Sequence, residues 1–157
     1  PDNAEQRRAA AEALPDLGDA VQALVLRALA RRPEPALAAH VEPLLSSADG
    51  DVRAAAALWM GEAGGAGQVP ELVRAMGAAE GESDALVGAL ARVFTRLPVG
   101  HTPLGTGEVE ALAEPARGSV LSAVALAGSD GALELLRDAL ASPSGATRSG
   151  APTSPST

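Results

Sequence analysis

The chain has 157 residues and a formal net charge of −8 at pH 7, and 46% of its residues are hydrophobic. This length indicates a single domain, and this hydrophobic content is too high for a disordered chain. All twelve basic residues are Arg, and none of the segments 1–32, 33–99 and 100–157 carries net positive charge. Because phosphate binding needs clustered Lys and Arg, we expect no nucleic-acid partner.

Residue usage excludes further classes of protein. The chain has no Cys, so it has neither disulfides nor thiolate chemistry. No apolar run approaches the roughly 20 residues that span a bilayer, and no signal peptide is visible. We therefore expect a soluble, cytoplasmic protein with no membrane partner.

The hydrophobic residues are those typical of helices. Alanine and leucine dominate, Ile and Tyr are absent, and Trp59 and Phe94 are the only aromatic residues. Strands favour β-branched and aromatic residues, whereas Ala, Leu, Arg and Glu favour helices. The composition therefore predicts an all-α fold whose helices pack closely on small side chains.

In chain order, the first predicted helix covers residues 4–14 and ends before Pro15, and we expect it to cap one end of a stack of helices. A second helix runs from Asp19 to about residue 32, where a proline-rich segment ends it. Its partner helix presents Leu37, Val41 and Leu44.

Residues 51–80 contain the clearest helix pair. Asp51 is expected to cap the first helix by accepting backbone N–H bonds, and the alanines at 54–57 allow close contact between helices. Gly64 and Gly65 end this helix. A second helix follows, with Pro70 in its first turn and apolar residues at helical spacing, namely Val69, Leu72, Val73 and Met76.

Two more pairs follow in the sequence. A helix over about 83–97 precedes a partner carrying Val109 and Leu112, and a helix beginning at 117–120 precedes one carrying Leu135, Leu136 and Leu140. The equivalent apolar positions Val21, Val52, Leu86 and Val120 are 31, 34 and 34 residues apart, which indicates an internal repeat. We predict a helical domain over 1–141, with units near 18–48, 49–80, 83–115 and 117–141, and a disordered Ser/Pro-rich tail or linker over 142–157.

The segment Asp51-Val52-Arg53-Ala54-Ala55-Ala56 resembles the first helix of HEAT repeats, especially the bacterial PBS-lyase-like subclass. The resemblance covers about residues 18–141 and implies a short right-handed α-solenoid of about four helix pairs, an armadillo-like superhelix. In that family the Arg commonly ties neighbouring repeats together. The other units have Gln22, Val87 and Leu121 at the Arg53 position, so we expect the polar ladder to be mostly missing and the packing to be looser.

The resemblance implies a non-enzymatic scaffold that binds a protein partner. One alternative is a structural subdomain of a larger protein. Another is a bilin lyase or isomerase, because a minority of relatives have such activity. The lack of Cys and of any residue identifiable as a tetrapyrrole ligand argues against this second alternative.

Two candidate partner-binding regions emerge. Charged residues lie opposite the apolar stripes of the second helices, and in a HEAT-like stack these helices line the concave side. The candidates on this ridge are Glu42, Glu71, Arg74, Glu114, Glu134 and Arg137. An ordinary solvated face with weak i, i+3 ion pairs is the alternative.

The second region is the loop over 97–107, which is longer than the other connections. Long ordered loops often carry function. Its candidate contact residues are Val99, His101 and Leu104, and the alternative is an insertion without function.

No pattern predicts catalysis, a cofactor or a metal. His40 and His101 are the only histidines, and neither belongs to an HxxxH or HExxH motif. His40 is expected at the edge of the core. The glycine-rich segment 61–67 precedes a helix but lacks the Lys-Ser/Thr of a phosphate loop, so we interpret it as a turn between helices.

Overall fold

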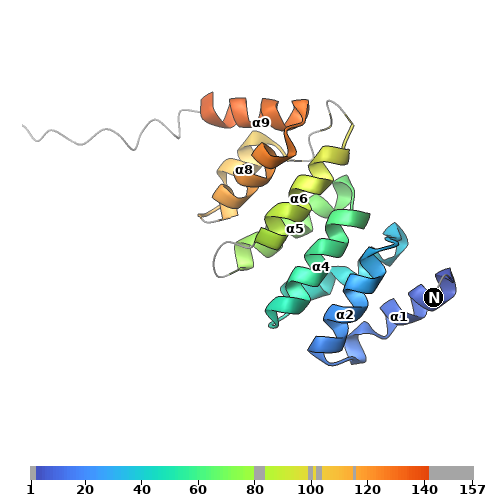
Figure 1. Cartoon of the computed structure of the whole chain (residues 1–157). Coiled ribbons are helices and arrows are strands. Elements are labelled where there is room, and N and C mark those ends of the chain that lie inside the picture. The colour runs from blue at the N-terminus through green and yellow to red at the C-terminus, as the bar shows by residue number, and fades with distance from the viewer. Residues whose placement is uncertain (1–2, 80–83, 99–100, 102–103, 115, 142–157) are drawn as a thin grey trace, which may run out of the picture.

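The computed structural model describes residues 3–79, 84–98, 101, 104–114 and 116–141, so the predicted tail over 142–157 lies outside it. The described residues form helices and no strand, which confirms the all-α prediction (Figure 1). The α-helices are α1 (Ala4–Glu12), α2 (Asp19–Ala30), α3 (Ala38–Val41), α4 (Gly50–Ala63), α5 (Val69–Ala78), α6 (Asp84–Arg96), α7 (Thr106–Glu110), α8 (Ala116–Ala127) and α9 (Asp130–Ala141).

The even-numbered helices from α2 to α8 pack against one another in order. The most extensive helix contacts join α2 to α4, α4 to α6 and α6 to α8, and these four helices form a row across the molecule (Figure 1). We call this row the first layer. The other helices, α1, α3, α5, α7 and α9, form the second layer: α3 contacts α4, α5 contacts α6 and α8, and α9 contacts α7 and α8.

The core lies between the two layers, and α4 is its most deeply buried helix. Val52, Trp59 and Met60 of α4 are fully buried, as are the alanines at 56 and 57. From the second layer, the apolar residues predicted for α5 are all buried, namely Val69, Leu72, Val73 and Met76. The helical spacing read from the sequence therefore identifies the buried side of α5 correctly.

Small residues set the distance between α4 and α6. A Cβ added to Gly61 would lie 2.9 Å from the Cα of Ala89 and 3.3 Å from its Cβ. These distances are too short for a side chain, so α4 and α6 approach each other almost backbone to backbone at this point. The close packing on small residues that composition predicts occurs here.

Gly64 ends α4, as predicted, because of a second close approach. Its N–H donates to the carbonyl oxygen of Met60 at 2.7 Å, and an added Cβ would lie 2.4 Å from that oxygen.

The start of α4 differs from the prediction. The helix begins at Gly50, and Asp49 is its cap: the Asp49 Oδ1 accepts from the Val52 N–H at 2.9 Å. Asp51 lies inside the first turn, so its assignment as the cap was wrong.

The partner of α2 is a broken helix. It consists of a 3-10 turn (Pro35–Leu37), the single α-turn α3 and a second 3-10 helix (Glu42–Ser46). Pro43 explains the break, because proline has no N–H to donate and its ring clashes with the carbonyl four residues earlier. Leu37 and Val41 are nevertheless buried as predicted, and Leu44 packs against the core while partly exposed.

Polar side chains tie the units together through backbone carbonyls. Arg53 donates from Nη1 to the carbonyls of Ser47 at 2.7 Å and Ala48 at 2.9 Å. Gln22, which stands at the equivalent position, donates to the carbonyl of Leu14 at 2.8 Å while almost fully buried. An amide therefore replaces the guanidinium in the first unit.

The third unit uses a different position for the same purpose. Arg96 at the end of α6 donates to the carbonyl of Gly64 at 2.8 Å, and Arg92 pairs with Glu62 across the α4–α6 contact at 3.5 Å. Helix α6 has Val87 at the Arg53 position, so the polar link from that position is missing there, as expected. Other side chains nevertheless make a polar link between α4 and α6. These links were not foreseen from the sequence.

Gly61→Ala should destabilise the protein. The new methyl group must displace Ala89, and overpacking of this kind costs about 1–3 kcal/mol, which exceeds the gain in helix propensity of about 1 kcal/mol. Gly77→Ala is the matched control, because a Cβ there meets nothing within 4 Å. In urea denaturation Gly77→Ala should be neutral or stabilising. Equal effects of the two changes would contradict the close α4–α6 approach.

Ala56→Leu tests the packing of α4 on its other neighbours. Ala56 is fully buried, so three added carbon atoms should lower the free energy of unfolding by about 1–3 kcal/mol. Ala9→Leu on the exposed surface of α1 provides the reference and should change stability by less than about 0.5 kcal/mol. An unchanged melting temperature for Ala56→Leu would show that this side of α4 is loosely packed.

Candidate functional site

A surface hollow lies between α5 and the segment that contains α7. It encloses about 600 Å³ and is lined by Pro70, Val73, Arg74, Gly77, Ala78, Leu104, Glu108 and Leu112. A volume of this size is within the range of ligand and peptide pockets. We call it the α5–α7 hollow, and it lies in the second layer, where the sequence predicts the binding face.

Helix α5 provides one wall because of its residue spacing. Leu72 and Met76 turn into the core, whereas Pro70, Val73 and Gly77 follow one another at i, i+3 and i+7 along the adjoining side. The exposed Gly77 adds no side chain to this wall, and a Cβ built there would meet open space. The glycine therefore helps to keep the hollow open.

The rim of the hollow carries both signs of charge. Arg74 is largely exposed and forms an ion pair with Glu71, one turn earlier on α5. On the opposite wall, the Glu108 Oε2 accepts from the Gly105 N–H at 2.7 Å and so caps the start of α7. A partner that enters the hollow therefore meets apolar walls with an arginine at one edge and a carboxylate at the other.

The structure brings together one residue from each predicted region. Arg74, predicted on the ridge, and Leu104, predicted on the long loop, line the same hollow. Its place in a loop had suggested that Leu104 is a free contact residue. Leu104 is only 5% exposed, so it forms part of the wall instead. His101 is exposed, and its N–H donates to the Pro98 carbonyl at 3.0 Å. Val99 lies outside the described residues.

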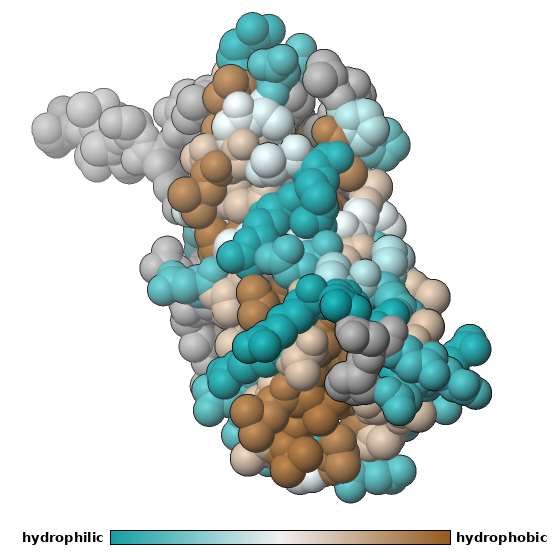
Figure 2. Space-filling view, turned by 45° about the vertical axis from the view of Figure 1, so that its right-hand side comes forward, coloured by the Kyte–Doolittle hydropathy of each residue, from teal (hydrophilic) through white to brown (hydrophobic). Residues whose placement is uncertain are grey.

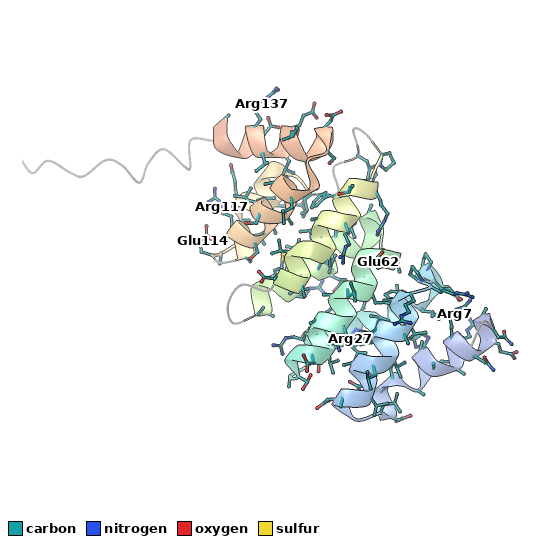
Figure 3. All side chains as sticks on the ribbon, viewed as in Figure 1. Arg7, Arg27, Glu62, Glu114, Arg117 and Arg137 are labelled. Atoms are coloured by element: carbon teal, nitrogen blue, oxygen red, sulfur yellow. The ribbon has the colours of Figure 1, made fainter. Side chains whose placement is uncertain are left out.

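The other predicted ridge residues are dispersed. Glu42 is half-buried in the 3-10 helix that follows α3, and Glu134 and Arg137 are exposed on α9. Glu114 lies in the turn before α8, where its Oε2 accepts from the Gly118 N–H at 3.3 Å. Figure 3 shows Glu114 beside Arg117 at the start of α8, well away from Arg137 on α9. The similar sequence register of these residues does not place Glu114 on a second-layer helix.

His40 and the glycine-rich segment 61–67 are the remaining features that the sequence analysis considered. His40 is half-buried on α3, as expected for the edge of the core. The glycine-rich segment forms the end of α4 and a 3-10 turn (Ala66–Gln68), in which the Gln68 Oε1 accepts from the Gly65 N–H at 2.9 Å. Within the described residues, no three His, Asp or Glu side chains are grouped so that they could hold a metal ion.

A second hollow, not foreseen from the sequence, lies between α1 and α2. It encloses about 580 Å³ and is lined by Gln6, Arg7, Ala10, Val25, Ala28, Leu29, Arg31 and Arg32. Arg7 is paired with Glu34, but its Nη1 is buried without a hydrogen-bond partner. The arginines at 31 and 32, directly after the end of α2, were the available signal, although the sequence alone could not bring Arg7 beside them.

Comparison with known proteins adds no relative. No protein-family model matches the chain, and neither a curated protein nor a solved structure matches it. No helix among the residues described is both long enough and apolar enough to cross a membrane.

Proposed function

We propose that this chain is a non-enzymatic protein-binding module, built as a short right-handed α-solenoid of the HEAT-like type. The row of α2, α4, α6 and α8, whose helices contact their neighbours in chain order, supports the repeat architecture. The Arg53 and Gln22 side chains support it further, because both bind carbonyl groups of the preceding segment from equivalent positions. In such a stack the second layer is the concave surface.

The observation that carries the binding proposal is the α5–α7 hollow. Its walls are apolar, it opens on the second layer, and it joins Arg74 of the predicted ridge to Leu104 of the predicted loop. A further hollow of about 440 Å³ lies at the C-terminal end of α5 and is lined partly by Arg53, Ala78 and Ala79. Two hollows that share Ala78 at the end of α5 suit an extended peptide or a partner helix that crosses this end of the helix.

The charges on this surface favour a particular partner. The chain carries a net charge of −8, Glu108 lines the hollow, and Glu71 pairs with Arg74 one turn away on α5. A peptide with an apolar anchor residue flanked by Lys or Arg complements this rim. Such rim charges mainly accelerate association and respond to salt, whereas the apolar anchor provides most of the affinity.

Two changes should alter binding in opposite directions without affecting the fold. Gly77→Phe fills the hollow with a ring from an exposed position that has open space beside it, and Arg74→Glu makes the rim more acidic. Peptides selected from a displayed library against the native protein serve as probes, with affinities measured by fluorescence anisotropy. We expect Gly77→Phe to weaken binding at least tenfold, and Arg74→Glu to strengthen the binding of peptides flanked by Lys or Arg, with a steeper loss of affinity as salt increases.

Arg27→Glu on α2 provides the matched control, because it reverses an exposed arginine in the first layer. It should leave the affinity for these peptides within about twofold of the native value, and circular dichroism should give similar melting temperatures for all variants. Peptides that bind Gly77→Phe normally but lose affinity for Arg27→Glu would place the binding surface in the first layer and overturn the proposal.

A further inference from the structure

The flank by which each first-layer helix contacts the preceding one can be identified from α6. Ala89 of α6 meets Gly61 of α4, Arg92 pairs with Glu62, and Arg96 donates to the Gly64 carbonyl. The same flank of α6 carries Leu86 and Val93, both buried. Apolar residues thus fill this flank, and two arginines bind the preceding helix at its edge.

Helix α2 carries a similar set of residues, but among the described helices no first-layer helix packs against this flank. Residues 65 positions before those of α6 are Val21, Leu24, Arg27, Ala28 and Arg31. Val21 is 48% exposed and Leu24 64% exposed, whereas the equivalent Leu86 and Ala89 are buried. We call this surface the α2 flank. Figure 2 shows hydrophobic surface gathered at the end of the molecule where α2 lies.

Helix α1 does not close this end of the row. It contacts α2 and α3, and the hollow that it forms with α2 involves Val25, Ala28 and Leu29. Val21 and Leu24, which precede Ala28 by two turns and one turn, stay exposed. The contacts of α1 with both layers correspond to those of a second-layer helix, and no helix of the described residues occupies the first-layer position in front of α2.

The opposite end of the row offers the complementary surface. On α4, the residues at 54, 57 and 61 share the side that receives α6, and all three are Ala or Gly. By the 68-residue offset the corresponding residues are Ser122, Ala125 and Ser129, of which Ser122 and Ala125 lie on α8 and are exposed. Helix α8 ends at Ala127, so Ser129 lies in the turn that follows, and the exposed Asp130, offset by 68 from Glu62, begins α9. We call this surface the α8 face.

We propose that copies of this chain associate head to tail, with the α2 flank of one copy packed on the α8 face of the next. Val21 and Leu24 then cover Ser122 and Ala125 of α8, at a wider helix spacing than between α4 and α6, because Leu24 stands at the Ala89 position. Arg27 approaches Asp130 of the neighbouring copy, and this pair has the same charges as the Arg92–Glu62 pair. Because the two surfaces differ, the contact is heterologous and can add further copies. This inference is independent of the proposed peptide-binding function.

The charge distribution of the chain supports this choice of occupant. The segment 1–32, which contains the α2 flank, has no net charge, whereas the whole chain carries −8. In the described residues, the large hydrophobic side chains that are exposed on the row lie at its two ends, Val21 and Leu24 on α2 and Leu126 on α8, and Leu133 is exposed on α9 outside the row. A second copy covers both ends of the row with one contact, which an unrelated helix cannot do.

Two variants, each of which blocks one surface, test the proposal. Leu24→Arg blocks the α2 flank and Ala125→Arg blocks the α8 face, and both residues are exposed, so the fold should be unaffected. In sedimentation velocity, the native chain should show a mass that increases with concentration beyond the dimer. Each variant alone should be a monomer. An equimolar mixture should form dimers and nothing larger, because one intact surface of each kind is left.

Leu133→Arg is the matched control, since it places the same charge at an exposed leucine outside both surfaces. It should associate like the native chain, and circular dichroism should show similar melting for all variants. Three results would each overturn the proposal: a native chain that stays monomeric at about 1 mM, where even a contact with a millimolar Kd is well populated; an Ala125→Arg variant that still associates alone; or a mixture of the two blocked variants that stays monomeric.

Discussion

The close contact between α4 and α6 is the constraint on which the rest of the structure depends. Gly61 brings the two helices almost backbone to backbone at Ala89. At this distance dispersion contacts between the backbones replace those of large side chains, and the carbonyl of Gly64 comes within reach of Arg96. A chain with few aromatic residues can build a dense core in this way, because small residues fill the space by approach and not by volume.

Polar links at the ends of the helices fix the register of this packing. Gln22, Arg53 and Arg96 each donate to a backbone carbonyl at a helix end or in a turn. Because a buried carbonyl without a partner is costly, these bonds favour one alignment of neighbouring units over others displaced by a turn. The bond from Gln22 is the most enclosed, since this amide is almost fully buried.

The proposed binding surfaces lie where this packing is incomplete. The second layer contains short and broken helices, and the five-residue α7 leaves the α5–α7 hollow beside the longer α5. In the described residues the first layer runs from α2 to α8, and these two helices expose unlike surfaces. One layer thus provides a hollow with apolar walls and a mixed-charge rim, and the other provides two unlike surfaces at the ends of the described row.

Local signals in the sequence determined the helices, the repeat and much of the core. The helical spacing of apolar residues predicted the buried side of α5, and glycines predicted the end of α4. The interval of 31 residues predicted that Val21 and Val52 stand at equivalent places in their helices. The position of the cap was less well determined, since Asp49 and not Asp51 caps α4. Both acids precede the apolar residues of the helix, and the sequence does not show which of them has the backbone geometry of a cap. Pro43 could have indicated the broken partner of α2, since its effect is also local.

Only the tertiary structure decided which of these residues are covered. Val21 and Val52 have equivalent places in their helices, yet Val52 is buried and Val21 is half exposed, because α2 packs against α4 whereas no described first-layer helix packs in front of α2. Leu104 seemed to be a free loop residue but forms a wall of the hollow beside α5. Arg7 of α1 and Arg31 at the end of α2 line the same hollow. Helical periodicity reports how a segment is patterned along itself, whereas burial depends on the segments that fold against it, and those are set by packing over long distances in the chain.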